Sequence, residues 1–76
     1  MVTAKDVVGI ARVNGTLLRQ LIKDNFKNQE EFAEHVGLSK SFISRLVNNN
    51  ADCSIKTLSR IARPFGVSVR LLIKEN

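Results

Sequence analysis

The chain has 76 residues, 43% of them hydrophobic and 25% charged, which is the composition of one small soluble domain and excludes a disordered tail, a membrane protein and a two-domain enzyme. Twelve Lys and Arg against seven Asp and Glu give a net charge of +5, so we expect an anionic partner, nucleic acid ahead of a membrane surface. Residues 1–34 carry five cations and five acids, whereas residues 35–74 carry seven cations and one acid, so the positive charge belongs to the C-terminal half.

Residues 1–13 fit two local structures. Thr3 to Asp6 has the spacing of a capping box and would open a helix. The apolar residues Val7, Val8, Ile10 and Val13 would equally suit an extended segment. Gly9 lies among them and weakens a helix at that point. We therefore expect an N-terminal extension over residues 1–13, extended or loosely docked, ahead of a folded domain over residues 14–76.

The first helix of that domain is predicted over residues 15–25. It follows Asn14-Gly15, and its apolar residues recur at i, i+1, i+4 and i+5, as on one face of an amphipathic helix. They are Leu17, Leu18, Leu21 and Ile22. Phe26 is expected to close this helix against the core.

A second, short helix is predicted from Gln29. Asn28 lies three residues before Glu31, so the Asn oxygen can accept one free helix amide while the Glu reaches back to the amide of Asn28. Its buried face is expected to consist of Phe32, Ala33 and Val36. Gly37 ends it, because glycine adopts the positive φ of a helix C-terminus without a steric penalty.

The helix after Ser39, its predicted N-cap, has two chemically different faces when its residues are placed at 100° steps. The apolar face consists of Phe42, Ile43, Leu46 and Val47. The polar face consists of Lys40, Ser41, Ser44, Arg45 and Asn48. That face holds no acid, and the asparagine run 48–50 is expected to end the helix in a turn.

Two further helices complete an all-α prediction of five short helices. Ser54 caps the fourth, and Pro64 should end or distort it near Arg63, because proline disfavours helical geometry in the residue before it. Its buried residues are expected to be Ile55, Leu58, Ile61, Ala62 and Phe65. The fifth is expected after Ser68, and its apolar residues suit either closure of the core or a dimer surface. They are Val69, Leu71, Leu72 and Ile73.

The second and third helices have the internal order of a helix-turn-helix. Ala33, four residues before Gly37, lets the two helices approach closely, and the glycine supplies the tight turn. Ile43 and Leu46 face inward and anchor the third helix. The polar face of that helix therefore projects outward.

A B-DNA major groove admits one α-helix, so this polar face would reach base edges. Arg45 would donate to O6 and N7 of guanine, and Lys40 would meet guanine or a phosphate, with Asn48, Ser41 and Ser44 completing the contacts. The alternative is a face that only contacts water. Phosphates would be held near the helix N-termini by Asn28, Gln29, Ser39 and Lys56. Lys56, Arg60 and Arg63 form a stripe that would either touch phosphate or face water, and Asn49 is a further candidate contact.

Residues 28–73 resemble the lambda-repressor and Cro-like helix-turn-helix family, also called the XRE family. The resemblance is carried by Asn28-Gln29-Glu30-Glu31-Phe32-Ala33, Val36-Gly37-Leu38-Ser39-Lys40-Ser41, Ile43-Ser44-Arg45, Ile61-Ala62, Gly66-Val67-Ser68-Val69 and Leu71-Leu72. It implies a compact five-helix domain whose third helix enters the major groove. It also implies base contacts by Lys40, Ser41, Ser44 and Arg45, and a phosphate contact by Gln29.

The chain departs from this family pattern in three places. Val47 stands where a Glu is common and is expected to pack instead. Asn49 replaces a frequent Gly, and Pro64 lies inside the fourth helix. Phe42 stands where a small residue is common, so it would contact either a thymine methyl group or a neighbouring helix.

No enzymatic or metal chemistry is expected. One cysteine, Cys53, and one histidine, His35, allow neither an internal disulfide nor a structural zinc site. Cys53 is expected to lie in a loop, and His35 at the surface of the second helix. The sequence has no paired carboxylates, nucleophile elbow or phosphate-binding glycine loop, so we expect no catalytic residues and no cofactor. It also lacks a signal-peptide core and a long apolar run, which favours the cytoplasm, on the nucleoid, and no membrane contact.

The resemblance predicts a sequence-specific DNA-binding transcriptional regulator. It would be a small repressor or Cro-type protein of a phage, prophage or bacterium, binding a pseudopalindromic operator as a homodimer. The alternative is an antitoxin of a toxin–antitoxin module, which would bind DNA by the same face and mask a toxin, for instance through residues 1–13.

Overall fold

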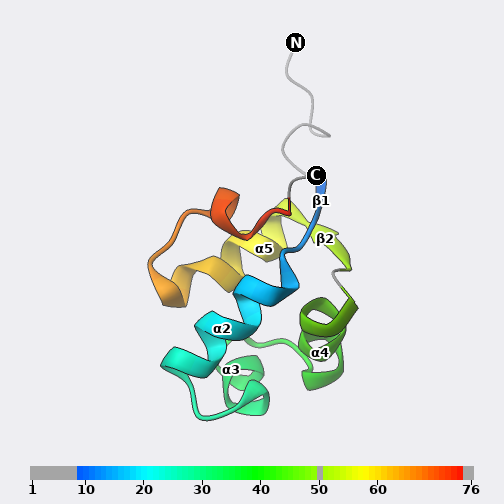
Figure 1. Ribbon diagram of the computed structural model, residues 1–76. Helices are drawn as coiled ribbons and strands as arrows, with labels where there is room; N and C mark the ends of the chain where they lie inside the picture. The colour runs from blue at the N-terminus through cyan, green and yellow to red at the C-terminus, as the bar shows by residue number, and fades with distance from the viewer. Residues whose placement is uncertain (1–8, 50, 75–76) are drawn as a thin grey trace.

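The computed structural model describes residues 9–49 and 51–74. Figure 1 shows its elements in chain order. They are β1 (Ile10–Arg12), α2 (Gly15–Asn25), α3 (Gln29–Val36), α4 (Lys40–Asn49), β2 (Asp52–Ser54), α5 (Ile55–Ala62), and the 3-10 turns η1 (Arg63–Phe65) and η2 (Val69–Leu72). The first four predicted helices are confirmed as α2, α3, α4 and α5. Predictions for residues 1–8 lie outside the described residues, and the division of the chain after residue 13 stays a prediction.

The predicted helix N-termini are confirmed by side-chain caps. The Asn14, Asn28, Ser39, Ser54 and Ser68 side chains each accept a backbone N–H of the helix or turn that follows. Such a cap supplies a partner for an amide that has none inside the helix. The Glu31 carboxylate differs from the prediction, because it accepts from the amide of Lys27 at 2.7 Å rather than from Asn28.

The core lies between the four helices and η2. Eight side chains in it have almost no exposed surface, and seven of them come from the apolar faces of the helices and of η2. The eight are Val13, Leu18, Phe32, Ile43, Leu46, Leu58, Ile61 and Leu72. Val47 is 5% exposed and packs with them, as predicted for a valine in place of the family's surface acid. This arrangement packs α4 against the core by its apolar face.

The predicted fifth α-helix is wrong. In its place, η2 forms only a 3-10 turn, and four α-helices are present among the described residues. The chain becomes extended at Ile73 because this residue pairs with Val13 in an antiparallel bridge. The amide of Lys74 then donates to the carbonyl of Arg12 at 2.8 Å. Pairing with the N-terminal segment therefore replaces the hydrogen bonds that another helical turn would have made.

The described residues also contain a small sheet, so the all-α prediction is corrected to a mostly helical fold with two strands. β1 and β2 pair antiparallel, with Ile10 opposite Ser54, Ala11 opposite Cys53 and Arg12 opposite Asp52. Arg12 Nε lies 3.2 Å from Asp52 Oδ1 in an exposed ion pair, which contributes at most about 1 kcal/mol. The sheet joins the segment before α2 to the segment between α4 and α5.

Cys53 lies in β2 and is only 7% exposed, so its predicted place in a loop is wrong. Its side chain belongs to the core, and Ala11, its partner across the sheet, packs against the same cluster. Burial raises the pKa of its thiol, and the neighbouring Asp52 carboxylate adds to the effect. The thiol therefore stays protonated and acts as a small apolar core group.

The α5 helix ends at Ala62, as the position of Pro64 predicts. The next three residues form η1, and Gly66 ends this turn with a φ of 68°. Phe65 of η1 stacks on Phe32 of α3 with their ring centroids 5.1 Å apart. The proline thus directs the chain back over the core.

The turn between α3 and α4 depends on Gly37, whose φ is 74° and whose amide donates to the carbonyls of Ala33 and Glu34. We expect Gly37→Ala to lower the free energy of unfolding by about 1–2 kcal/mol, because a Cβ disfavours this left-handed conformation. Chemical denaturation measures the loss. Gly66→Ala is the matched control: its φ is similar and a Cβ there meets nothing within 4 Å, so it should show the conformational cost alone, whereas at Gly37 the Arg60 guanidinium lies 3.1 Å away and adds to the loss. An unchanged stability in Gly37→Ala would contradict this account of the turn.

Candidate nucleic-acid interface

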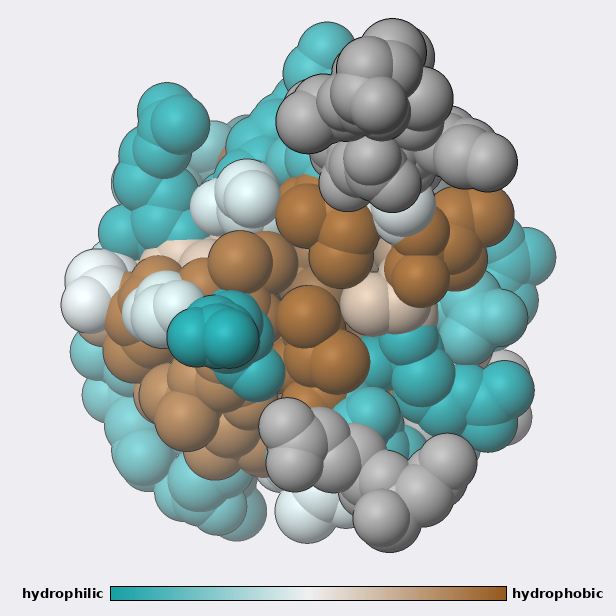
Figure 2. Space-filling model, turned by 90° about the horizontal axis from the view of Figure 1, so that it is seen from above, coloured by the Kyte–Doolittle hydropathy of each residue, from teal (hydrophilic) through white to brown (hydrophobic). Residues whose placement is uncertain are grey.

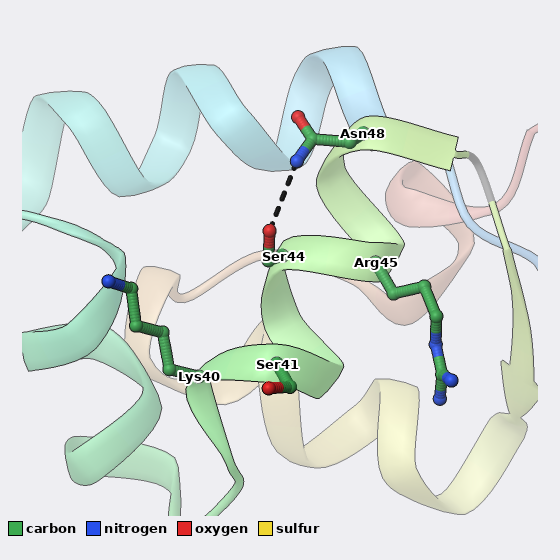
Figure 3. A pocket seen from close by; sticks show the side chains of 5 residues that line it. All are labelled: Lys40, Ser41, Ser44, Arg45 and Asn48. Carbon is green, nitrogen blue, oxygen red and sulfur yellow. Dashed lines mark hydrogen bonds between the residues drawn. The ribbon is translucent and has the colours of Figure 1, made fainter.

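The five polar residues predicted to read bases line one open hollow on α4. They are Lys40, Ser41, Ser44, Arg45 and Asn48, and we call them the recognition surface. Their positions follow from helix geometry, because Ile43 and Leu46 are fully buried and every residue on the opposite side of α4 then faces solvent. Figure 3 shows Lys40 and Arg45 extending to opposite sides of α4. No acid lines this hollow, so two cations and three neutral polar groups face outward.

Two hydrogen bonds organise one end of the recognition surface. The amide Nδ2 of Asn48 donates to Ser44 Oγ at 3.1 Å, one helical turn away (Figure 3). Arg19 of α2 donates from Nη2 to Asn48 Oδ1 at 2.6 Å. Arg19 of α2 is therefore hydrogen-bonded to the recognition surface.

A second hollow lies between α2 and the N-terminus of α3. It is lined by Arg19, Ile22, Lys23, Lys27, Asn28 and Gln29. Asn28 and Gln29 were predicted to contact phosphate, and the structure places them beside three cations. Sequence reasoning missed Arg19, Lys23 and Lys27, although the i, i+4 spacing of Arg19 and Lys23 places these two on one side of α2. Lys27 follows the end of α2 and is brought beside them by the turn into α3.

The remaining predicted contacts lie elsewhere or already have partners. The Ser39 hydroxyl accepts the amide of Phe42 at 3.1 Å as the α4 cap. Phe42 is half-buried against the core, and the guanidinium carbon of Arg45 lies 6.0 Å from its ring centroid, at the outer limit of a cation–π contact. Asn49 is the last residue of α4.

The cations of α5 and η1 do not line the hollow of the recognition surface. Lys56 is exposed near the start of α5. Arg60 lines a different hollow, together with His35, Val36, Arg63 and Pro64. His35 is exposed, as predicted, and its ring lies 5.3 Å from that of Phe26. The structure thus brings Lys40, Ser41, Ser44, Arg45 and Asn48 together but leaves Arg60 outside the group.

The described residues hold no group of three or more His, Cys, Asp or Glu side chains placed to bind a metal ion. Within residues 9–49 and 51–74, no helix combines the length and apolar character that a membrane span requires.

Two short helices, α3 and α4, are joined at Gly37, and α4 packs by its apolar face and presents a cationic surface without acids. This arrangement defines a helix-turn-helix DNA-binding domain. A family model described as helix-turn-helix matches residues 18–72, so the chain belongs to the XRE, or lambda-repressor-like, helix-turn-helix family. This is a family of DNA-binding regulators rather than of enzymes, and double-stranded DNA is the partner that membership implies. No curated protein and no solved structure matches the chain significantly.

Proposed function

We propose that this regulator is a sequence-specific transcriptional repressor or Cro-type protein of a phage, prophage or bacterium. The observation that carries the proposal is the recognition surface itself: five polar side chains on one face of α4, two of them cationic and none acidic, lining one hollow. A helix with such a face suits the major groove, where donors meet the acceptors of guanine and thymine.

Each group has a proposed role in the complex. Arg45 donates to O6 and N7 of guanine, and Lys40 reaches guanine or a phosphate from the other side of α4. Ser41, Ser44 and Asn48 complete the base contacts. Phosphates are held by Asn28 and Gln29 in the cationic hollow beside α3, by Lys56, and near the Ser39 cap. Phosphate contacts set the register of the protein on DNA, and the α4 side chains set the sequence.

We further propose that two copies bind a pseudopalindromic operator. One domain of this size covers only about 600–1,000 Å² of DNA, which gives limited specificity. Apolar side chains gather across the end of the molecule that carries η2 (Figure 2). Two large apolar side chains of the described residues are exposed, Leu71 of η2 at 51% and Ile10 of β1 at 71%. Contact between two copies would remove such surface from water.

Selection of binding sites from random duplexes, followed by titration of the selected site against salt, tests this function. We expect an inverted repeat with half-sites about 10–10.5 bp apart. We also expect the logarithm of the binding constant to fall linearly with the logarithm of the salt concentration, with a slope of about −0.9 for each phosphate that the protein neutralises. Failure to enrich any sequence would overturn sequence-specific binding by the chain alone. If enrichment then required a co-expressed protein, the antitoxin alternative would replace the repressor.

A further inference from the structure

We propose that Arg19 of α2 is a positioning residue that sets the base preference of α4 at one operator position. It acts by fixing the orientation of the Asn48 amide and, through it, the Ser44 hydroxyl. Arg19 acts in this way only if α4 reads bases, so the inference rests on the proposed function.

The orientation follows from hydrogen-bond chemistry. Arg19 Nη2 lies 2.6 Å from the Asn48 side chain, and a guanidinium has donors but no acceptor. The atom of Asn48 that faces it must therefore be Oδ1. The Nδ2 group then points to Ser44 Oγ, 3.1 Å away. Without Arg19, the Asn48 amide could turn over, because either end of it can bond to a hydroxyl.

This orientation occupies the edge of Asn48 that would read adenine. A bidentate contact with adenine needs Oδ1 to accept from N6 and Nδ2 to donate to N7 at the same time. Here Oδ1 is held by Arg19 on α2, and Nδ2 is turned toward Ser44 (Figure 3). In this orientation Asn48 can still offer a single hydrogen bond to a base, but not the bidentate contact that reads adenine.

The Ser44 hydroxyl is given a direction by the same chain of bonds. Because Ser44 Oγ accepts from Asn48, its own proton is free to point away from Asn48 and toward DNA. A hydroxyl that donates meets base acceptors, which in the major groove are O6 and N7 of guanine, O4 of thymine and N7 of adenine. Guanine offers two adjacent acceptors, whereas adenine offers N7 beside the N6 amino donor, so the position facing Ser44 and Asn48 is expected to favour guanine over adenine.

The neighbouring cation Lys23 offers a matched control. It lies one turn after Arg19 on α2 and lines the same cationic hollow. Lys23→Met therefore removes one positive charge from that hollow and leaves the Arg19–Asn48 hydrogen bond in place. Arg19→Met removes the charge and the hydrogen bond together.

The test compares operator duplexes that carry each of the four bases at this position. Arg19→Met is expected to raise the affinity for adenine relative to guanine by about tenfold, the lower range for one bidentate contact. Lys23→Met is expected to weaken binding to all four bases equally. Neither Asn48→Ala nor the double variant Arg19→Met/Asn48→Ala should gain adenine affinity, because the gain requires a free Asn48 amide.

If Arg19→Met weakened binding to all four duplexes equally, as Lys23→Met should, the inference would be overturned. A base preference at the operator position facing Arg45 would, in that case, still support the proposed function. A wild-type protein without base preference at any position would overturn both. Arg19→Ala serves if the methionine variant does not fold, since alanine is the best helix former and removes the same bond. Far-UV circular dichroism establishes folding before each titration.

Discussion

Replacing Phe32 by alanine is expected to lower the free energy of unfolding by about 3–5 kcal/mol, the range for removing a buried aromatic side chain from a core. Phe32 has no exposed surface. Its ring contacts those of Phe26 and Phe65, with centroids 5.1 Å away in each case. The substitution would therefore remove the ring contacts by which α3 holds Phe26 of the α2–α3 loop and Phe65 of η1. A domain of this length has only about 4–11 kcal/mol in total, so much of the folded population would be lost.

Urea denaturation followed by far-UV circular dichroism measures this loss, because the chain has neither Trp nor Tyr to serve as a fluorescent probe. Leu71→Ala is the control, since Leu71 is 51% exposed and its truncation should cost less than about 1 kcal/mol. Equal losses in the two variants would contradict the central place of Phe32 in the core.

Replacing Arg45 by alanine is expected to weaken operator binding by about 1–3 kcal/mol and to relax base preference at one position. Arg45 is exposed and extends from α4 on the side away from Lys40 (Figure 3). Its guanidinium carbon lies 6.0 Å from the centroid of the Phe42 ring, at the outer limit of a cation–π contact. The five N–H donors of the guanidinium therefore remain available to DNA. A bidentate bond to guanine would be lost without disturbing the fold.

Competition titrations against duplexes with single base changes measure the loss of affinity and the loss of base preference separately. Arg63→Ala removes the same charge from a different hollow, beside His35 and Arg60, and should leave every base preference unchanged. If Arg45→Ala weakened binding but kept the discrimination at all positions, Arg45 would be a phosphate contact and not a base reader.

Several parts of the fold were predictable because their causes lie within one helical turn. The caps at Asn28 and Ser54 act on amides three residues away. Gly37 and Pro64 end helices through their own backbone geometry. The recognition surface was predictable for the same reason, because 100° steps along α4 place its five residues on one face.

Other features depend on contacts between distant segments. The sheet pairs residues 10–12 with residues 52–54, and these three-residue strands are too short for a periodic pattern to predict them. The predicted fifth helix became a 3-10 turn because Ile73 pairs with Val13. Local helix propensity at residues 69–73 was outweighed by hydrogen bonds to a segment some 60 residues earlier.

The candidate site, like the fold, has one part that the sequence determines and another that depends on tertiary packing. The sequence alone determined which residues α4 turns outward, since a helix with four apolar residues on one face must bury that face. Only the tertiary structure decided that Arg19 reaches Asn48, 29 residues further along the chain, and that Lys23 and Lys27 lie beside Asn28 and Gln29. Side chains from different helices meet only once the core has set the helices against each other, and periodicity within one helix carries no record of that packing.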